Sequence, residues 1–79
     1  MTRAAGLYAP MPVATRLGAG GRLESVGDSR VEAVREEWLV EDRWWTYSPL
    51  RRHYFELVLE SGRCVTIFHD IAAGGWFEQ

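Results

Sequence analysis

The sequence predicts an all-β domain, either a small antiparallel meander sheet or a partly closed barrel. Nine of the ten aromatic residues fall between Trp38 and Phe77, so most of the large apolar side chains belong to the C-terminal half. In the same half, apolar and polar residues alternate on both sides of Ser61-Gly62, as in two strands joined by a tight hairpin. Each buried aromatic ring hides roughly 150 to 250 Å², so we expect these rings to form the core.

The length of 79 residues fits one domain, which we expect to span residues 12–79. Residues 1–11 are mostly small side chains without periodicity, and we expect a flexible leader there. Cys64 is the only cysteine, which excludes an internal disulfide and a multi-cysteine zinc site. Together with the lack of any membrane-spanning stretch, this fits a protein of the reducing cytoplasm.

The first predicted element is a hairpin. Val13, Thr15 and Leu17 alternate with Ala14 and Arg16, as in a strand. The Gly-Ala-Gly-Gly run at residues 18–21 then permits a turn. Leu23 and Val26 then indicate a returning strand that ends before Gly27-Asp28.

The segment from Ser29 to Val40 allows two interpretations. Ser29 and Glu32 form a Ser-x-x-Glu capping box, and Val31, Val34 and Trp38 recur at helical spacing, which favours a helix. In a strand, however, Val34, Trp38 and Val40 would share one face, and the aromatic segment that follows needs pairing partners. We favour the strand and keep the helix as the alternative.

A polar turn at Glu41-Asp42-Arg43 is expected to follow, before a short element that contains Trp44-Trp45. Ser48-Pro49 ends this element, because proline lacks the N–H that a β-ladder needs and restricts the residue before it.

The firmest prediction is the hairpin from Arg52 to Asp70 with a two-residue Ser61-Gly62 loop. Counting outward from this loop pairs Leu59 with Cys64 and Val58 with Val65. The predicted core face then carries Phe55, Leu57, Leu59, Cys64 and Phe68. The opposite face carries Tyr54, Glu56, Val58, Val65, Ile67 and His69.

After Asp70, the Ile71-Ala72-Ala73 run is expected to form one short turn that ends at Gly74-Gly75. Trp76 and Phe77 then belong to a last strand. Asp70 is a candidate to cap the backbone of this turn, or else to pair with His53 at the open end of the hairpin. We expect at least two of Trp38, Trp45 and Trp76 to be buried.

No catalytic or metal-binding signature stands out, and we expect no enzyme activity, no cofactor and no metal. Cys64, His69 and Asp70 supply the residue types of a catalytic triad, but an odd spacing puts Cys64 and His69 on opposite faces of one strand. Cys64 is expected to be buried instead. In the predicted register, His53 and His69 also face opposite ways, so they could not share a metal ion.

Two further patterns do not indicate a phosphate-binding or catalytic site. The Gly-Ala-Gly-Gly run resembles a phosphate-binding loop only in composition, since neither a lysine nor a helix follows it. Glu36-Glu37 and Glu41-Asp42 lie beside Arg35 and Arg43 on a predicted exposed face, where no apolar pocket would separate their pKa values.

Binding of single-stranded nucleic acid is the alternative function. Arg51-Arg52 adjoins Tyr54 and follows Trp44, Trp45 and Tyr47, and small β domains bind single strands by stacking bases beside basic side chains. The formal net charge of −2 argues against a dominant phosphate-binding surface.

One string of motifs resembles a known family. Its parts are Trp44-Trp45, Arg52-His53-Tyr54-Phe55, Leu59-Glu60-Ser61-Gly62-Arg63, Phe68-His69-Asp70 and Gly75-Trp76-Phe77. In order and spacing the string resembles a family of short bacterial proteins of unknown function and the C-terminal tail of ImuB, the inactive Y-family polymerase homologue of a bacterial translesion-repair system. The chain departs from that pattern at His69, where an arginine is common, and at Gly74, where a threonine is common. The resemblance covers about residues 31 to 79 and implies a protein-binding module linked to translesion DNA synthesis.

The sequence therefore predicts a non-enzymatic interaction domain. It would present an aromatic and arginine surface, or an unpaired strand edge, to a protein partner. The resemblance points to the translesion polymerase machinery as the source of this partner. A homodimer through the sheet edge is a second possible assembly. The candidate contact residues are Trp44, Tyr47, Arg51, Arg52, Tyr54 and His69.

Overall fold

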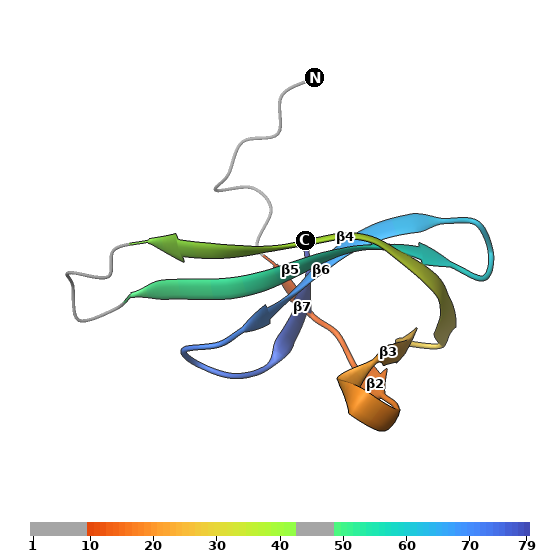
Figure 1. The fold of residues 1–79 in the computed structure, drawn as a ribbon, viewed down its shortest axis with the longest axis horizontal. Helices are drawn as coiled ribbons and strands as arrows, with labels where there is room; N and C mark the ends of the chain where they lie inside the picture. Colours follow the sequence, from red (N-terminus) through yellow and green to blue (C-terminus); the bar gives the residue numbers. More distant parts are fainter. Residues whose placement is uncertain (1–9, 43–48) are drawn as a thin grey trace, which may run out of the picture.

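The computed structural model describes residues 10–42 and 49–79, and the fold within them is all-β, as the sequence predicts. Seven strands form one antiparallel sheet that curls into a half-barrel (Figure 1). A short 3-10 turn at Ala19–Gly21 is the one helical element of the described residues. No helix in them is long and apolar enough to cross a membrane.

From β3 to β7 each strand lies beside the strand that precedes it in the sequence, so the fold is a meander. The order across the sheet is β1-β7-β6-β5-β4-β3-β2. The strands are β1 (Met11–Pro12), β2 (Thr15–Leu17), β3 (Leu23–Val26), β4 (Ser29–Asp42), β5 (Leu50–Leu59), β6 (Cys64–Asp70) and β7 (Trp76–Glu78).

The two ends of this sheet are joined by the chain itself. β1 pairs with β7 at one end, β2 pairs with β3 at the other, and only Val13 and Ala14 separate β1 from β2. The Val13 N–H donates to the Trp76 carbonyl at 3.0 Å, and the Gly27 N–H donates to the Ala14 carbonyl at 2.7 Å. This N-terminal segment therefore holds the curled sheet partly closed.

The buried core lies on one face of the sheet, which we call the inner face. Leu57, Leu59, Val65 and Ile67 of β5 and β6 project from this face. Leu23 and Val26 of the β2–β3 hairpin cover them, and Val13, Val31, Phe55 and Trp76 pack around the cluster.

The core is thus mainly aliphatic, and the expectation that at least two of Trp38, Trp45 and Trp76 are buried is wrong. Trp38 is 41% exposed and Trp76 is half-buried, while Trp45 lies outside the described residues. Leu57 and Ile67, in contrast, are completely buried.

The ambiguous segment after Ser29 is a strand, and it continues to Asp42. Two irregularities interrupt its pairing with β5, one between Val31 and Ala33 and one between Val34 and Glu36. An extra residue in one strand reverses the faces that follow it. Val34 consequently lies opposite Leu57 of the inner face, whereas Trp38 lies opposite Tyr54 of the outer face.

The turn expected at Glu41-Asp42-Arg43 does not begin there. Glu41 pairs with Arg51, and Asp42 pairs with Leu50, so both acidic residues belong to β4. The Trp44-Trp45 element expected next lies outside the described residues.

The β5–β6 hairpin exists as predicted, but its register is shifted by one residue. The Gly62 N–H donates to the Leu59 carbonyl, and the Leu59 N–H donates to the Arg63 carbonyl, both at 2.8 Å. Gly62 takes a φ of +90°, which allows the turn to use one residue more than a two-residue loop. Val58 therefore lies opposite Cys64 instead of Val65.

This one-residue shift exchanges the two faces of β6. Val65, Ile67 and His69 lie on the inner face, whereas Cys64, Phe68 and Asp70 lie on the opposite, outer face. The predicted division of β6 was thus wrong, although the division of β5 was correct.

The turn after β6 forms as the sequence predicts. Ile71–Ala73 make the turn, Gly74 and Gly75 both have positive φ, and β7 follows at Trp76. The Asp70 side chain accepts a hydrogen bond from the Ala73 N–H at 2.9 Å. The capping role of Asp70 is therefore confirmed, and its cross-strand partner is Arg52, not His53.

Candidate partner-binding surface

The predicted contact residues do not form one surface. Arg52 and Tyr54 lie on the outer face of β5, whereas Arg51 and His69 lie on the inner face of β5 and β6. Trp44 and Tyr47 lie outside the described residues, so their role stays a prediction.

On the outer face, a row of four aromatic rings crosses the sheet from β4 to β7. Trp38, Tyr54, Phe68 and Phe77 are successive cross-strand partners. The ring centroids are 5.4 Å apart from Trp38 to Tyr54, 5.0 Å from Tyr54 to Phe68 and 5.3 Å from Phe68 to Phe77. Phe68 is 1% exposed at the middle of the row, while Trp38 at its β4 end is 41% exposed.

Arg52 covers this row. Its guanidinium lies 4.4 Å from the Phe68 ring centroid, and its Nη1 donates to the Tyr54 hydroxyl at 3.1 Å. The Nε atom is buried and finds no hydrogen-bond partner among the described residues. Arg52 and Tyr54 therefore pack the outer face, and this engagement leaves them poorly placed to bind a partner.

The inner face brings the two histidines together. His53 lies directly opposite His69, which corrects the prediction that they face opposite ways. His53 stacks on Phe55 at 4.2 Å, and His69 stacks on Trp76 at 4.8 Å. The His53 Nε2 atom is 3.9 Å from the Glu37 carboxylate. Across residues 10–42 and 49–79, no group of three or more His, Cys, Asp or Glu side chains could hold a metal ion.

Cys64 is exposed, which contradicts the prediction that it is buried. The cause is the register shift, which moves its side chain to the outer face beside the hairpin turn. His69 remains on the inner face, so the thiol and this imidazole cannot act together, as the sequence indicates.

β4 has a long accessible edge, and every residue of this strand from Glu32 to Leu39 is exposed. β4 has 14 residues, yet β3 pairs only with Ser29 and Arg30. β5 pairs with the rest of β4 on one side, as far as Asp42. From Val31 onward, the described residues place no strand on the other side of β4 (Figure 1).

The register tells which main-chain groups of β4 are free. The Leu59 N–H and the Arg51 carbonyl bond toward β6, so the alternate residues Arg52 and Tyr54 direct their main-chain groups toward β4. Their partners Val40 and Trp38 use these bonds. The intervening Glu37, Leu39 and Glu41 must then direct their N–H and carbonyl groups away from the sheet.

The side chains along this edge combine exposed apolar groups with carboxylates. Val34, Trp38 and Leu39 are 41%, 41% and 53% exposed. The charged residues from 32 to 41 are Glu32, Arg35, Glu36, Glu37 and Glu41. Four carboxylates thus accompany one guanidinium.

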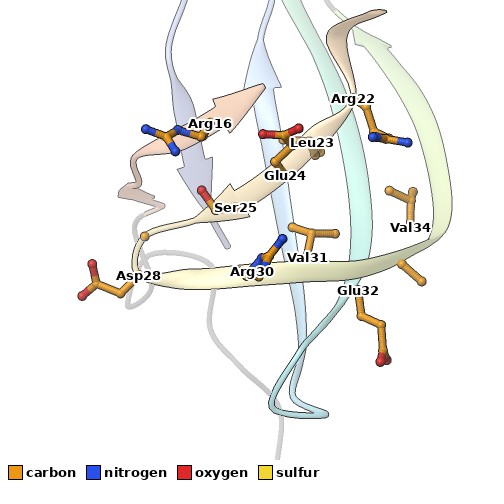
Figure 2. Close-up of a pocket in the computed structure, with 12 residues that line it drawn as sticks. Arg16, Arg22, Leu23, Glu24, Ser25, Asp28, Arg30, Val31, Glu32 and Val34 are labelled. Carbon is orange, nitrogen blue, oxygen red and sulfur yellow. The ribbon is translucent and has the colours of Figure 1, made fainter. Parts of the chain in front are cut away.

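Where β4 leaves β3, the two strands border a groove of about 700 Å³. Figure 2 shows Val31 and Val34 of β4 on one side of it and Leu23 and Glu24 of β3 on the other, while Glu32 points away from β3. The groove is continuous with the free edge, so the two form one surface that an extended chain could follow.

Comparisons with known proteins add no identity: no family model, no curated protein and no solved structure matches the chain. The candidate surface therefore stands on geometry alone. We define this surface as the edge of β4 that faces away from β5, from Val31 to Glu41, and call it the β4 edge.

Sequence reasoning foresaw an unpaired strand edge without naming its residues. The signal was present, because the run Arg35-Glu36-Glu37-Trp38-Leu39 has many charges and few apolar residues for a strand. Edge strands carry such charges to discourage unwanted pairing. The two β-bulges, which decide which side chains face outward, left no comparable signal.

Proposed function

We propose that the protein is a non-enzymatic interaction module that binds an extended segment of a protein partner along the β4 edge. The observation that carries this proposal is that β4, from Val31 to Glu41, pairs with β5 on one side while the described residues place no strand on its other side. An added strand would pair with the outward main-chain groups of Glu37, Leu39 and Glu41. Exposed Trp38 and Leu39 would supply side-chain contacts on the two faces.

A non-enzymatic role is supported by the separation of the reactive groups. Cys64 lies on the outer face, whereas His53 and His69 lie on the inner face. Nucleophilic catalysis needs a nucleophile and a base within hydrogen-bond reach, and these residues do not offer that pair.

The resemblance to the ImuB tail supports a partner within the translesion polymerase machinery. We propose this pathway as the place to look for the segment. A pull-down from DNA-damaged cells tests it, with recovery of translesion polymerase components as the expected result and their absence as the contrary one.

The strand-addition proposal is tested with two variants of Leu39. Leu39→Pro removes an outward N–H that β5 does not use, so the edge loses a donor while the β4–β5 ladder keeps its bonds. Leu39→Ala shortens the side chain and retains the N–H. Peptides selected from a displayed library on the wild-type protein should bind Leu39→Ala and lose at least about tenfold in affinity for Leu39→Pro.

Circular dichroism and thermal unfolding check that both variants fold. Should Leu39→Pro fail to fold, Leu39→Lys takes its place, because an edge lysine hinders strand pairing without removing an N–H. Selected peptides that bind all variants equally, or a library that yields no binder, would reject strand addition at the β4 edge.

We do not propose single-stranded DNA as the ligand. Glu36 and Glu56 lie beside exposed Trp38 on the outer face, and Arg52 is engaged with Phe68 and Tyr54. A phosphate backbone would be repelled where the accessible ring lies. Quenching of tryptophan fluorescence by an oligonucleotide at low salt would reverse this choice.

A further inference from the structure

The β4 edge has a chemical preference that follows from two pairs of outer-face residues. Glu36 and Glu56 are direct cross-strand partners, and Trp38 and Tyr54 are the next pair on the same face. Like charges directly opposite one another destabilise a sheet. In the part of the chain that the structure describes, no basic side chain lies within ion-pair distance of either Glu36 or Glu56.

The neighbouring Trp38 ring offers one free face. Its other face stacks on Tyr54 with an interplanar angle of 6° and a centroid distance of 5.4 Å. Tyr54 lies on the β5 side, so the free face of Trp38 is directed toward the open edge of β4. A side chain from an added strand, placed opposite Trp38, would continue the aromatic row by one position.

The protein already contains an example of what fits such a position. The Arg52 guanidinium lies over Phe68 within the same row, at 4.4 Å from the ring centroid. A guanidinium is planar, stacks on aromatic rings and forms paired hydrogen bonds with carboxylates. Placed over Trp38, it would also reach the Glu36 carboxylate.

We infer that the segment bound along the β4 edge is basic, with an arginine that stacks on Trp38 and pairs with Glu36. This inference rests on the proposed function, since it assumes that a strand is added there. The excess of carboxylates at Glu32, Glu36, Glu37 and Glu41 extends the same preference along the strand, although Arg51 already neutralises Glu41 at 2.9 Å.

The same charges disfavour a second copy of the chain as the occupant. Two β4 edges paired with each other would bring two sets of carboxylates together with only Arg35 from each copy to offset them. Like-charge contacts of this kind oppose pairing, so a homodimer through β4 is the less favourable assembly.

The test uses three synthetic peptides, each long enough to pair with β4 from Ala33 to Glu41. In the first peptide, arginine alternates with threonine, so all arginines of the bound strand lie on one face. Whenever that face is the outer face, an arginine lies opposite Trp38. Glutamine replaces arginine in the second, and glutamate replaces it in the third. Isothermal titration calorimetry at low salt should show the arginine peptide binding about tenfold tighter than the glutamine peptide, with the glutamate peptide weakest.

Variants of the protein separate the two contacts. Glu36→Gln and Trp38→Leu should each weaken the arginine peptide about fivefold and leave the glutamine peptide nearly unchanged. Glu36→Gln should also raise the melting temperature, because it removes the repulsion from Glu56. A residue that merely supported the fold would lower stability and affinity together.

The possible failures are distinguishable. Equal binding of the arginine and glutamine peptides would overturn the basic preference and leave strand addition intact. No binding of any peptide would overturn both proposals. Binding of the arginine peptide that persists in Leu39→Pro would show diffuse charge attraction in place of strand pairing, and this too would overturn the inference.

Discussion

At the scale of single residues, most of the side chains that could take part in catalysis or binding instead contribute to the packing of the sheet. Arg52 covers Phe68, and Tyr54 accepts the Arg52 hydrogen bond. His53 and His69 stack on Phe55 and Trp76. In a domain this small, few large apolar side chains are available, so polar residues with flat rings or long stems take part in burial.

Asp70 is the residue whose structural role is the most direct to measure. Asp70→Ala removes the acceptor for the Ala73 N–H and should lower the free energy of unfolding by about 1 kcal/mol. Asp70→Asn retains an acceptor and should cost less. Urea denaturation of the two variants measures both values. Equal losses would mean that the negative charge opposite Arg52 matters more than the hydrogen bond.

At the scale of elements, β4 combines two different environments along one strand. Its first two residues, Ser29 and Arg30, pair with β3, whereas the residues from Val31 onward pair only with β5. The β-bulges turn Trp38 to the outer face and keep Val34 on the inner face. This arrangement presents apolar side chains on both faces of an open edge, which natural sheets usually avoid unless the edge has a partner.

Amide hydrogen exchange can test the openness of β4 residue by residue. We expect the amides of Glu37, Leu39 and Glu41 to exchange rapidly and those of Trp38 and Val40 to exchange slowly, because only the latter bond to β5. Two-dimensional NMR of the free protein measures the five rates. Uniform protection along β4 would instead indicate that a second copy of the chain already covers the edge.

At the scale of the whole molecule, the N-terminal segment closes the curled sheet. Met11 and Pro12 pair with β7 as the edge strand β1, and Val13 and Ala14 pass directly from that edge to the β2–β3 hairpin. This connection keeps Leu23 and Val26 over the inner face. The stability of the core therefore depends on a segment far from it in sequence.

Removal of residues 10–14 should demonstrate this dependence. A chain that begins at Thr15 loses the hydrogen bonds of Val13 and Ala14 and the partial burial of Val13, which together stabilise by about 2 to 4 kcal/mol. This is a large part of the total for a small domain. The matched control begins at Pro10, and thermal unfolding compares the two. Equal melting temperatures would show that the sheet remains closed without the segment.

The sequence by itself determined the all-β class, the β5–β6 hairpin and the turns after β2 and β6. Alternation located β5 and β6, and the glycines marked the connections after β2 and β6, because these local preferences act over a few residues. The same local reasoning separated Cys64 from His69, since side chains an odd number of residues apart leave opposite faces of a strand whatever its register.

Only the tertiary structure decided which faces meet and which edge stays open. A single residue more in the Gly62 turn exchanged the faces of β6, exposed Cys64 and placed His53 opposite His69. Likewise, the bulges of β4 and the short overlap with β3 created the free edge. Each outcome depends on how strands align over long distances, and a shift of one residue costs little locally while it reverses every side chain that follows.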